Sequence, residues 1–394
     1  MSGMTHLKVE NYRSLADVSL ELGPLNVMFG PNGSGKSTLL DTIWFFRDCA
    51  TRGVELASSE RSHGIGILWD GAEEGAQISL SLADDRVEYA LSFGLSAGRI
   101  EPFAGERLRS KSHDNVLIER SVGSSKAVQF NAAMGQFATF DLREPDKLSL
   151  SRYLDYDAKN SEAASLDHLL HFVRFYDTRS FFLYRLKRQG SETSHEIRLW
   201  ERGNNAWSVL RNLQDKRNVD ARFNTIMQFM RESFPTFNEL VLEQTGPNSV
   251  YASILEKGHR KEIHASGVSN GHLQMLLLLT ALFSEGNRNA VILFDEPETS
   301  LHPWALAVLA KAIKLAAREW NKQVFLATHS PVLVGQFDAE DILAMEIEEG
   351  RSRPRRLSRI AEIADLLKEY DAGALYMAEM VAAQSKSSYE QGTD

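Results

Sequence analysis

The sequence has one cysteine, Cys49, among its 394 residues. An internal disulfide is therefore impossible, and the scarcity of cysteine is typical of proteins that fold in a reducing compartment. Long apolar runs are also missing, because the longest, residues 273–283, is far short of the ~20 residues that a membrane-spanning helix needs. The N-terminal stretch MSGMTHLKVENYRS has no apolar signal core. We therefore expect a cytoplasmic protein with no membrane partner.

The chain also lacks an excess of basic residues, with 44 Lys and Arg against 53 Asp and Glu. The formal net charge of -9 argues against a uniformly basic nucleic-acid binder. Two local clusters depart from this average, at residues 174–222 and at residues 351–359, where five arginines occur. Either these clusters bind a polyanion such as nucleic acid, or they are solvated surface charge, and the sequence leaves both readings open.

The most specific motif is a glycine-rich stretch, GPNGSGKST, at residues 30–38. It fills every fixed position of the phosphate-binding pattern G-x-x-x-x-G-K-[ST], between a strand-like run at 25–29 and a helix-like run at 37–46. Such a loop turns its backbone N–H groups toward a polyphosphate, and the following helix points its positive end at the same charge. A chance glycine-rich turn is the alternative, and the flanking strand and helix weigh against it.

This loop predicts a nucleoside-triphosphate site with a bound Mg²⁺. Lys36 can reach the β- and γ-phosphates, and the Ser37 hydroxyl can ligand the metal. The residues expected to bind the nucleotide here are Asn32, Gly33, Ser34, Gly35, Lys36, Ser37 and Thr38.

A second apolar run, residues 291–294, ends in two carboxylates, Asp295 and Glu296. In a parallel sheet the carboxyl ends of the strands border the ligand crevice, so Asp295 can hold Mg²⁺ and Glu296 can orient and deprotonate the attacking water. The alternative, a helix N-cap, does not usually follow four buried apolar residues and precede a proline. A third run, residues 324–327, leads to His329, which can donate a hydrogen bond to the γ-phosphate. Taken alone, such a histidine is more often structural.

The remaining pattern predicts an α/β fold. Strand-like and helix-like runs alternate at both ends of the chain and bracket a middle part of hairpins and helices. We expect one nucleotide-binding domain built from residues 1–100 and 240–384, an insertion at 101–239 and a flexible tail at 385–394. A polar loop is predicted at 51–63, and a polar, irregular segment that leaves room for further short strands at 101–150. Strands are predicted at 7–9, 18–22, 77–82, 87–93, 239–243, 250–255 and 342–347, a strand or loop at 175–184, and helices at 165–173, 221–234, from about 269, and at 304–320.

Taken in order, these motifs resemble those of the ABC-type ATPase superfamily, and within it the RecF/SMC/OLD-like AAA branch. The resemblance is carried by NYRSL at 11–15, FDEPETSLHP at 294–303 and ATHSP at 327–331, and it covers roughly residues 4–50 and 260–375. It implies an ATPase with an α/β ABC-type head, an antiparallel β lobe and a mixed helical and β insertion.

The resemblance also implies roles for further residues. Ser269 and Gly271, in the segment VSNGHLQ, match the signature that binds the γ-phosphate of the opposite subunit's nucleotide. Their donors at a helix N-terminus suit that role. Residues 299–302 match the D-loop at the dimer interface, His329 the switch histidine, and Arg13 an arginine near the phosphates. An ATP-dependent head-to-tail homodimer is therefore implied.

Some positions depart from the family pattern. Asn270 and His272 stand where transporters have glycine and glutamine, which moves the chain away from that branch. The glutamine that usually links the sheet to Mg²⁺ has no clear match. Gln77 and Gln129 are candidates, or residues 176–181 take its structural place without a glutamine.

Proteins with these motifs are similar to ATPase subunits of bacterial anti-phage defence systems. Only 65 residues follow His329, too few for the TOPRIM nuclease domain of many relatives, so we expect a separately encoded effector, a nuclease or other toxin, as partner. One alternative is a RecF-like DNA-repair clamp that grips DNA through the basic clusters. The other is a nucleotide-gated scaffold with negligible hydrolysis.

Overall fold

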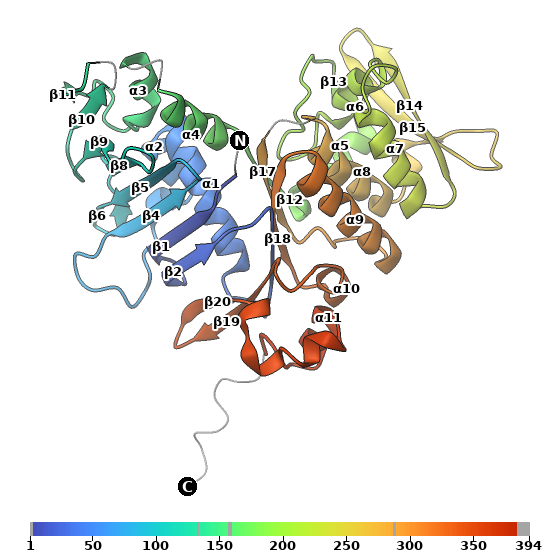
Figure 1. Cartoon of the computed structure of the whole chain (residues 1–394). Helices are drawn as coiled ribbons and strands as arrows, with labels where there is room; N and C mark the ends of the chain where they lie inside the picture. Colours follow the sequence, from blue (N-terminus) through green and yellow to red (C-terminus); the bar gives the residue numbers. More distant parts are fainter. Residues whose placement is uncertain (1–2, 132–133, 157–159, 287–288, 384–394) are drawn as a thin grey trace.

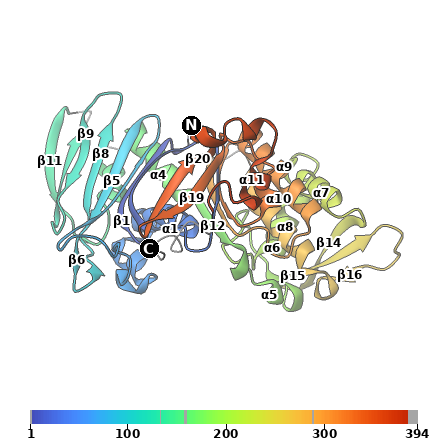
Figure 2. The ribbon, with the colours of Figure 1, turned by 90° about the horizontal axis from the view of Figure 1, so that it is seen from below.

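The computed structural model describes residues 3–131, 134–156, 160–286 and 289–383. Figure 1 shows two lobes flanking a central sheet, with an antiparallel lobe in blue to green and a helical lobe in olive to orange. The view from below in Figure 2 shows the same separation. Each lobe has its own hydrophobic core, and the two cores lie against opposite faces of the central sheet.

The central sheet has the strand order β12-β17-β18-β3-β19-β20. Its first five strands are parallel, and β20 pairs antiparallel with β19. Leu293 faces the core of the antiparallel lobe, whereas Ile292 and Phe294 face that of the helical lobe. Burial on both faces explains why these strands are continuously apolar. The strands are β3 (Leu25–Phe29), β12 (Val173–Asp177), β17 (Ala290–Asp295), β18 (Lys322–Thr328), β19 (Ile342–Glu348) and β20 (Arg351–Arg356).

An eight-stranded antiparallel sheet, ordered β11-β10-β9-β8-β5-β4-β1-β2, forms the other lobe. The strands predicted at 77–82 and 87–93 are confirmed as β4 and β5. The short strands that the polar segment at 101–150 left room for are present as β8 to β11, which continue this sheet. The strands are β1 (His6–Tyr12), β2 (Leu15–Glu21), β4 (Ile78–Ala83), β5 (Val87–Phe93), β8 (Gly105–Ser110), β9 (Val116–Arg120), β10 (Lys126–Asn131) and β11 (Gln136–Asp141), and a separate short pair is β6 (Leu95–Ser96) with β7 (Arg99–Ile100).

The polar loop predicted at residues 51–63 is wrong. Helix α1 (Lys36–Arg52) extends into it, and α2 (Val54–Ser59) and a 3₁₀ turn (Ser62–Gly64) follow. The segment is polar on average, but two of its apolar side chains, Val54 and Ala57, are fully buried in the core of this lobe and hold the helix there. Helices α3 (Leu150–Tyr156) and α4 (Ser161–His171) complete this lobe.

The helical lobe is built around α8 (Asn270–Phe283), in which every residue from 273 to 283 is buried. The longest apolar run is therefore a core helix, and none of the described helices is long and apolar enough to cross a membrane. The other elements of this lobe are α5 (Leu183–Arg188), α6 (Ala206–Gln214), α7 (Arg222–Ser233), α9 (Pro303–Glu319), and the small sheet of β13 (Ser191–Glu192), β14 (Phe237–Gly246), β15 (Ser249–Glu256) and β16 (Ile263–His264). Helices α10 (Pro331–Val334) and α11 (Ala372–Met377) lie near the C-terminus.

The middle of the chain contributes to both large sheets. Strand β12 lies within the expected insertion at 101–239, yet it pairs with β17 in the central sheet. Strands β8 to β11 lie in the same stretch and extend the sheet of β4 and β5. The outline of core and insertion stays a prediction, and the tail predicted at 385–394 lies outside the described residues.

Candidate functional site

The glycine-rich loop connects β3, inside the central sheet, to α1. At two positions of the loop only glycine fits, because neighbouring atoms lie too close for a Cβ atom. A Cβ on Gly30 would lie 2.3 Å from the carbonyl oxygen of Met345, and one on Gly35 would lie 2.2 Å from the hydroxyl oxygen of Ser352. Gly35 also has a φ angle of 96°, which side chains disfavour. The glycine-rich loop therefore packs closely against β19 and β20.

Lys36 begins α1 and folds back over the loop. Its ammonium nitrogen donates hydrogen bonds to the carbonyl oxygens of Gly30 and Pro31, each at 2.9 Å. Burial lowers the pKa of Lys36 to about 8, although nearby carboxylates act in the opposite direction. The hydroxyl oxygen of Ser34 is buried without a hydrogen-bond partner. A polyphosphate would accept hydrogen bonds from both side chains, so the loop fits this ligand.

Ser37 and Asp295 bring the two predicted halves of the site together. The Ser37 hydroxyl donates a hydrogen bond of 3.0 Å to Oδ1 of Asp295, at the end of β17. Burial raises the pKa of Asp295 to about 6, and the Ser37 hydrogen bond partly offsets this. Hydroxyl and carboxylate oxygens are ligands that Mg²⁺ takes together with substrate phosphates. The hydroxyl of Ser37 and the carboxylate of Asp295 therefore fit a Mg²⁺ that arrives with the nucleotide.

Glu296 follows Asp295 in a left-handed backbone conformation, with a φ angle of 50°. Its N–H donates to the carbonyl oxygen of Ala327 at 2.9 Å, and its own carbonyl accepts from the hydroxyls of Thr178 and Thr299. A strained conformation held by three hydrogen bonds is typical of a functional position. The direction in which the Glu296 side chain leaves the end of β17 is therefore fixed by β18 and by the turns that carry Thr178 and Thr299.

His329 and Glu298 lie beside this carboxylate. The His329 Nε2 atom is 4.0 Å from Oε1 of Glu296. Burial, followed by the nearby charge of Lys36, lowers the pKa of His329, so its ring favours the neutral form. Oε1 of Glu298 accepts a hydrogen bond of 2.7 Å from the backbone N–H of His329 and thereby fixes the start of the loop after β18. Glu298 is a further residue of the site that was not predicted from the sequence, although it lies in the motif at 294–303 that carries the family resemblance.

Arg179 is a site residue that the sequence analysis missed. It lies in a 3₁₀ turn (Thr178–Ser180) directly after β12. Its Nε atom is 3.1 Å from Oδ1 of Asp177, and its two terminal nitrogens are 3.5 Å from Oδ2 of Asp295 and 3.3 Å from Oε1 of Glu296. One guanidinium thus pairs with three carboxylates. The signal available in the sequence was the segment at 176–181, which contains this arginine.

Neither glutamine candidate reaches the site. Gln129 is buried in β10, where its amide donates to the Ser149 hydroxyl at 2.7 Å. The Gln77 carbonyl accepts a hydrogen bond from Asn11, next to β4. Gln129 lies in a strand of the antiparallel sheet and Gln77 directly precedes one, so both residues belong to the antiparallel lobe.

Arg13 lies beside the loop, on a turn with a φ angle of 51°. Its neighbour Ser14 is close to Gly35, because a Cβ there would lie 3.0 Å from the Ser14 hydroxyl. The Arg13 side chain points elsewhere, to Asp41 of α1, at 3.3 Å. A role of Arg13 at the phosphates therefore stays a prediction.

The signature segment begins α8. Ser269 is its N-cap, with an exposed side chain whose oxygen accepts from the His272 N–H at 3.3 Å. A Cβ on Gly271 would lie 2.6 Å from the carbonyl oxygen of Ser300, so the D-loop packs against the start of the helix. The His272 ring, at a position where transporters have glutamine, stacks on Phe234 with ring centroids 3.7 Å apart. Within the described part of one chain, no hydrogen bond joins Ser269 or Gly271 to the glycine-rich loop.

The basic clusters are not uniform surfaces. Arg174 is 5% exposed and pairs with Glu285 at 2.9 Å, so this residue is not part of an exposed basic surface, and nucleic-acid binding by the cluster at 174–222 stays a prediction. Arg222 pairs with Asp220. In the second cluster, Arg353, Arg355 and Arg359 pair with carboxylates of β19, β2 and the C-terminal segment, namely Glu348, Glu346, Glu362 and Glu21.

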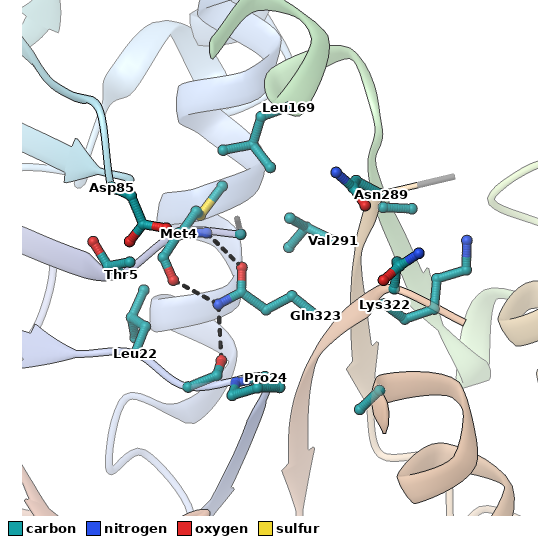
Figure 3. A pocket seen from close by; sticks show the side chains of 15 residues that line it. Met4, Thr5, Leu22, Pro24, Asp85, Leu169, Asn289, Val291, Lys322 and Gln323 are labelled. Carbon is teal, nitrogen blue, oxygen red and sulfur yellow. Dashed lines mark hydrogen bonds between the residues drawn. The ribbon is translucent and has the colours of Figure 1, made fainter. Parts of the chain in front are cut away.

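A cavity of the protein lies at the opposite end of the central sheet, next to the starts of β17 and β18 (Figure 3). The Gln323 amide crosses it, donating to the carbonyl oxygens of Met4 at 2.7 Å and Gly23 at 2.8 Å and accepting from the Met4 N–H at 2.8 Å. These bonds tie the N-terminal segment to β18. The chemistry-bearing side chains are at the carboxyl ends of the strands instead.

Comparison with known proteins shows the family to which the chain is similar. The model of the AAA_21 family, described as "AAA domain, putative AbiEii toxin, Type IV TA system", matches residues 25–335. The chain is 50% identical over 40 residues to an OLD nuclease of Thermus scotoductus, covering 10% of this chain and 8% of that protein. It is 24% identical over 202 residues to the DNA replication and repair protein RecF of Heliobacterium modesticaldum, covering 50% and 48%. The chain thus spans about half or less of these relatives.

Among solved structures, the chain is similar to a Smc head bound to the C-winged helix domain of ScpA. The TM-score is 0.57 at 15% identity, and the match covers 90% of this chain and 97% of that one. A second Smc head, with an extended coiled coil and the C-terminal domain of ScpA from Pyrococcus furiosus, matches with a TM-score of 0.52 at 13% identity, covering 93% and 100%. At these identities the likeness concerns the fold alone, which is that of an ABC-type ATPase head.

Proposed function

Because the chain belongs to the AAA_21 family, in the RecF/SMC/OLD-like branch of AAA-type ATPases, we propose that it binds ATP with Mg²⁺ and hydrolyses it. The observation that carries the proposal is the convergence of Lys36, Ser37, Asp295, Glu296 and His329 at the carboxyl ends of β3, β17 and β18. In parallel sheets, this edge is where ligands bind.

The proposed chemistry follows from these side chains. Backbone N–H groups of the loop and Lys36 bind the phosphates, while Ser37 and Asp295 hold the metal. When bound, Mg²⁺ neutralises charge on the phosphate oxygens. Glu296 orients a water and accepts its proton, and its rigid backbone fixes the direction of attack. Neutral His329 donates a hydrogen bond to the γ-phosphate.

We further propose that two copies close head to tail around two nucleotides. Ser269 is exposed at the start of α8, where backbone N–H groups and the helix dipole favour a phosphate of the second copy. The packing of Gly271 on Ser300 joins this helix start to the D-loop, so both would enter the dimer interface as one surface. Binding would close the dimer and hydrolysis would reopen it.

The experiment that tests this proposal compares wild type with Glu296→Gln. We expect turnover to fall at least about a hundredfold, because the general base is lost. Nucleotide binding should survive, and an ATP-dependent dimer should accumulate in light scattering. A variant with wild-type turnover would contradict the role of Glu296, and a wild type that binds no ATP would contradict the function.

The biological role that we favour is that of the ATPase or sensor subunit of a prokaryotic anti-phage defence complex, gating a separately encoded nuclease or toxin. The support is the description of the matched family as a toxin of a Type IV system and the similarity to an OLD nuclease. Expression of this chain, its Lys36→Ala variant and its neighbouring genes in phage-challenged cells tests the role. Protection should need both intact Lys36 and a second gene.

A second candidate function, ATP-dependent binding of nucleic acid, is favoured by the surface of α5. Phe182 and Tyr184 are 38% and 73% exposed, and each carries an arginine against its ring. The Arg202 guanidinium is 4.7 Å from the Phe182 centroid, and that of Arg188 is 5.8 Å from the Tyr184 centroid. Exposed aromatics beside cations stack the bases of single strands.

Helix α5 is a rigid platform for such stacking. Leu186 is fully buried, its carbonyl accepts from the Trp207 indole at 3.1 Å, and the Lys187 carbonyl accepts from the Tyr251 hydroxyl. Fluorescence anisotropy with a labelled single-stranded oligonucleotide tests this candidate. Tyr184→Ala should weaken binding about tenfold or more, because a stacked base contributes about 1–3 kcal/mol. The control Tyr370→Ala removes an equally aromatic, 53% exposed side chain elsewhere.

The scaffold alternative, with negligible hydrolysis, is decided by the wild-type turnover in the first experiment. It would replace the ATPase proposal if the chain binds ATP and dimerises without turnover in the presence of its partners.

A further inference from the structure

The site contains a cation that the family pattern does not explain. Arg179 pairs with Asp177, Asp295 and Glu296 through three different nitrogens, at 3.1, 3.5 and 3.3 Å. Lys36, the other cation nearby, directs its hydrogen bonds to backbone carbonyls of the loop. The guanidinium is therefore the group that neutralises both the proposed metal-binding carboxylate and the proposed base.

The chemistry of arginine excludes a role as a metal ligand. In the family that the chain resembles, a glutamine links the sheet to Mg²⁺, and the segment at 176–181 is one candidate for its structural place, with no glutamine in it. Arginine has five N–H donors and no acceptor, and it stays charged. A guanidinium at Oδ2 of Asp295 and a metal ion at Oδ1 of the same carboxylate would repel each other across a few ångströms. Arg179 and the metal thus compete for the same carboxylates.

We propose that Arg179 is a positioning residue that makes the metal site conditional on nucleotide. It holds Asp295 and Glu296 in place and keeps a free divalent cation from binding them, and it yields only to a metal that arrives with the negative charge of a polyphosphate. This inference rests on the proposed function. It adds that the affinity of the site for Mg²⁺ is set by an arginine of the same chain.

The surroundings let the side chain move while the backbone stays. The Arg179 side chain is 52% exposed, so it has room to leave the carboxylates. The turn beneath it is fixed, because the Thr178 hydroxyl donates to the carbonyl oxygens of Asp295 and Glu296, and the Thr178 carbonyl accepts from the amide of Gln274, a buried residue of α8. A released guanidinium therefore stays at the site, where it can turn toward the phosphates.

The geometry also separates arginine from lysine. Each of the three carboxylates is met by a different nitrogen of one planar group. A lysine ammonium is a single point charge and cannot span the same three partners. Arg179→Lys should accordingly fall between wild type and a neutral variant.

The test measures metal binding directly. Full-length wild type, Arg179→Ala, Arg179→Gln and Arg179→Lys are titrated with Mn²⁺ alone and followed by electron paramagnetic resonance. A second series follows binding of a fluorescent ATP analogue at increasing Mg²⁺. Arg179→Ala and Arg179→Gln should bind free Mn²⁺ about tenfold more tightly and reach half-saturation at about tenfold lower Mg²⁺, as expected for the loss of a competing ion-pair network.

Arg318→Ala is the matched control, because Arg318 is an exposed arginine that pairs with Asp338, away from the site. It should leave both titrations unchanged. Unchanged or weaker metal binding in Arg179→Ala and Arg179→Gln, with thermal midpoints like that of wild type, would overturn the inference. If those variants still bind and hydrolyse ATP, the proposed function survives that result. If no protein in the series binds ATP at any Mg²⁺ concentration, the proposed function fails as well.

Discussion

The two ends of the central sheet use the same strands for opposite purposes. At the carboxyl ends of β3, β17 and β18, charged groups are buried, their pKa values are displaced, and Glu296 has a left-handed backbone. At the amino ends, the amide of Gln323 makes three hydrogen bonds and ties the N-terminal segment to the sheet (Figure 3). One end carries strain and charge that suit chemistry, and the other holds the chain together. Substitutions should therefore affect binding at one end and stability at the other.

The largest expected effect is at the carboxyl end, in Lys36→Ala. Hydrogen bonds to a charged group contribute about 1.5–3 kcal/mol each, so losing those to phosphate should weaken ATP binding about a hundredfold or more. Stability should not fall, because burial disfavours the charged ammonium, as its lowered pKa of about 8 indicates. Isothermal titration calorimetry measures the loss of ATP affinity, and a thermal melt checks that stability is unchanged. A melt lowered by several degrees would mean that Lys36 also supports the fold.

Gln323→Ala tests the amino end and should give the reverse result. The substitution leaves buried backbone groups of Met4 and Gly23 without a partner, which costs about 2–3 kcal/mol of unfolding free energy. ATP affinity below the melting range should match that of wild type. Denaturant unfolding and the same calorimetry provide the measurement. A variant with normal stability but weakened ATP binding would show that the two ends are coupled.

Asp295→Asn sharpens the comparison through pH. The pKa of Asp295 is raised from 3.8 to about 6, so the folded state binds a proton more tightly than the unfolded state. Stability of the wild type should thus decrease as pH rises from about 4 to 6, and a neutral side chain should be more stable above pH 6 by on the order of 2 kcal/mol. Melts in a metal chelator from pH 4 to 8 should show this gain shrinking toward pH 4. A constant gain at every pH would point to a cause other than the buried charge.

The difference between the ends also explains what the sequence could predict. The motifs at residues 30–38 and 294–303 are local, and continuous apolar runs mark strands that are buried on both faces, so the carboxyl end could be assembled from spacing alone. Arg179 could not, because it reaches Asp295 only when β12 pairs with β17, more than a hundred residues later. The role of Gln323 was likewise not predictable, because its hydrogen-bond partner Met4 lies at the other end of the chain.

Buried polar residues of the antiparallel lobe were equally hard to predict, because their partners are also distant in the sequence. Glu106 in β8 is a charged residue in a polar stretch, yet its side chain is buried and accepts hydrogen bonds from the Tyr89 hydroxyl at 2.6 Å and the Leu150 N–H at 2.9 Å. Composition could not distinguish this inward-facing carboxylate from a solvated one. The sequence therefore allowed for short strands in this stretch, but the pairing of β8 to β11 into one sheet came from the structure.

The smallest effect is expected for Glu298→Gln, and it tests how finely the carboxyl end is adjusted. Oε1 of Glu298 accepts from the backbone N–H of His329 at 2.7 Å, and a glutamine oxygen can accept the same bond. Burial raises the pKa of Glu298, so removing its charge should cost little stability. Turnover of Glu298→Gln should stay within about threefold of wild type, whereas Glu298→Ala, which leaves the N–H without its partner, should lose about tenfold or more. If the two variants lose turnover equally, then the negative charge, rather than the position of His329, is what this residue contributes.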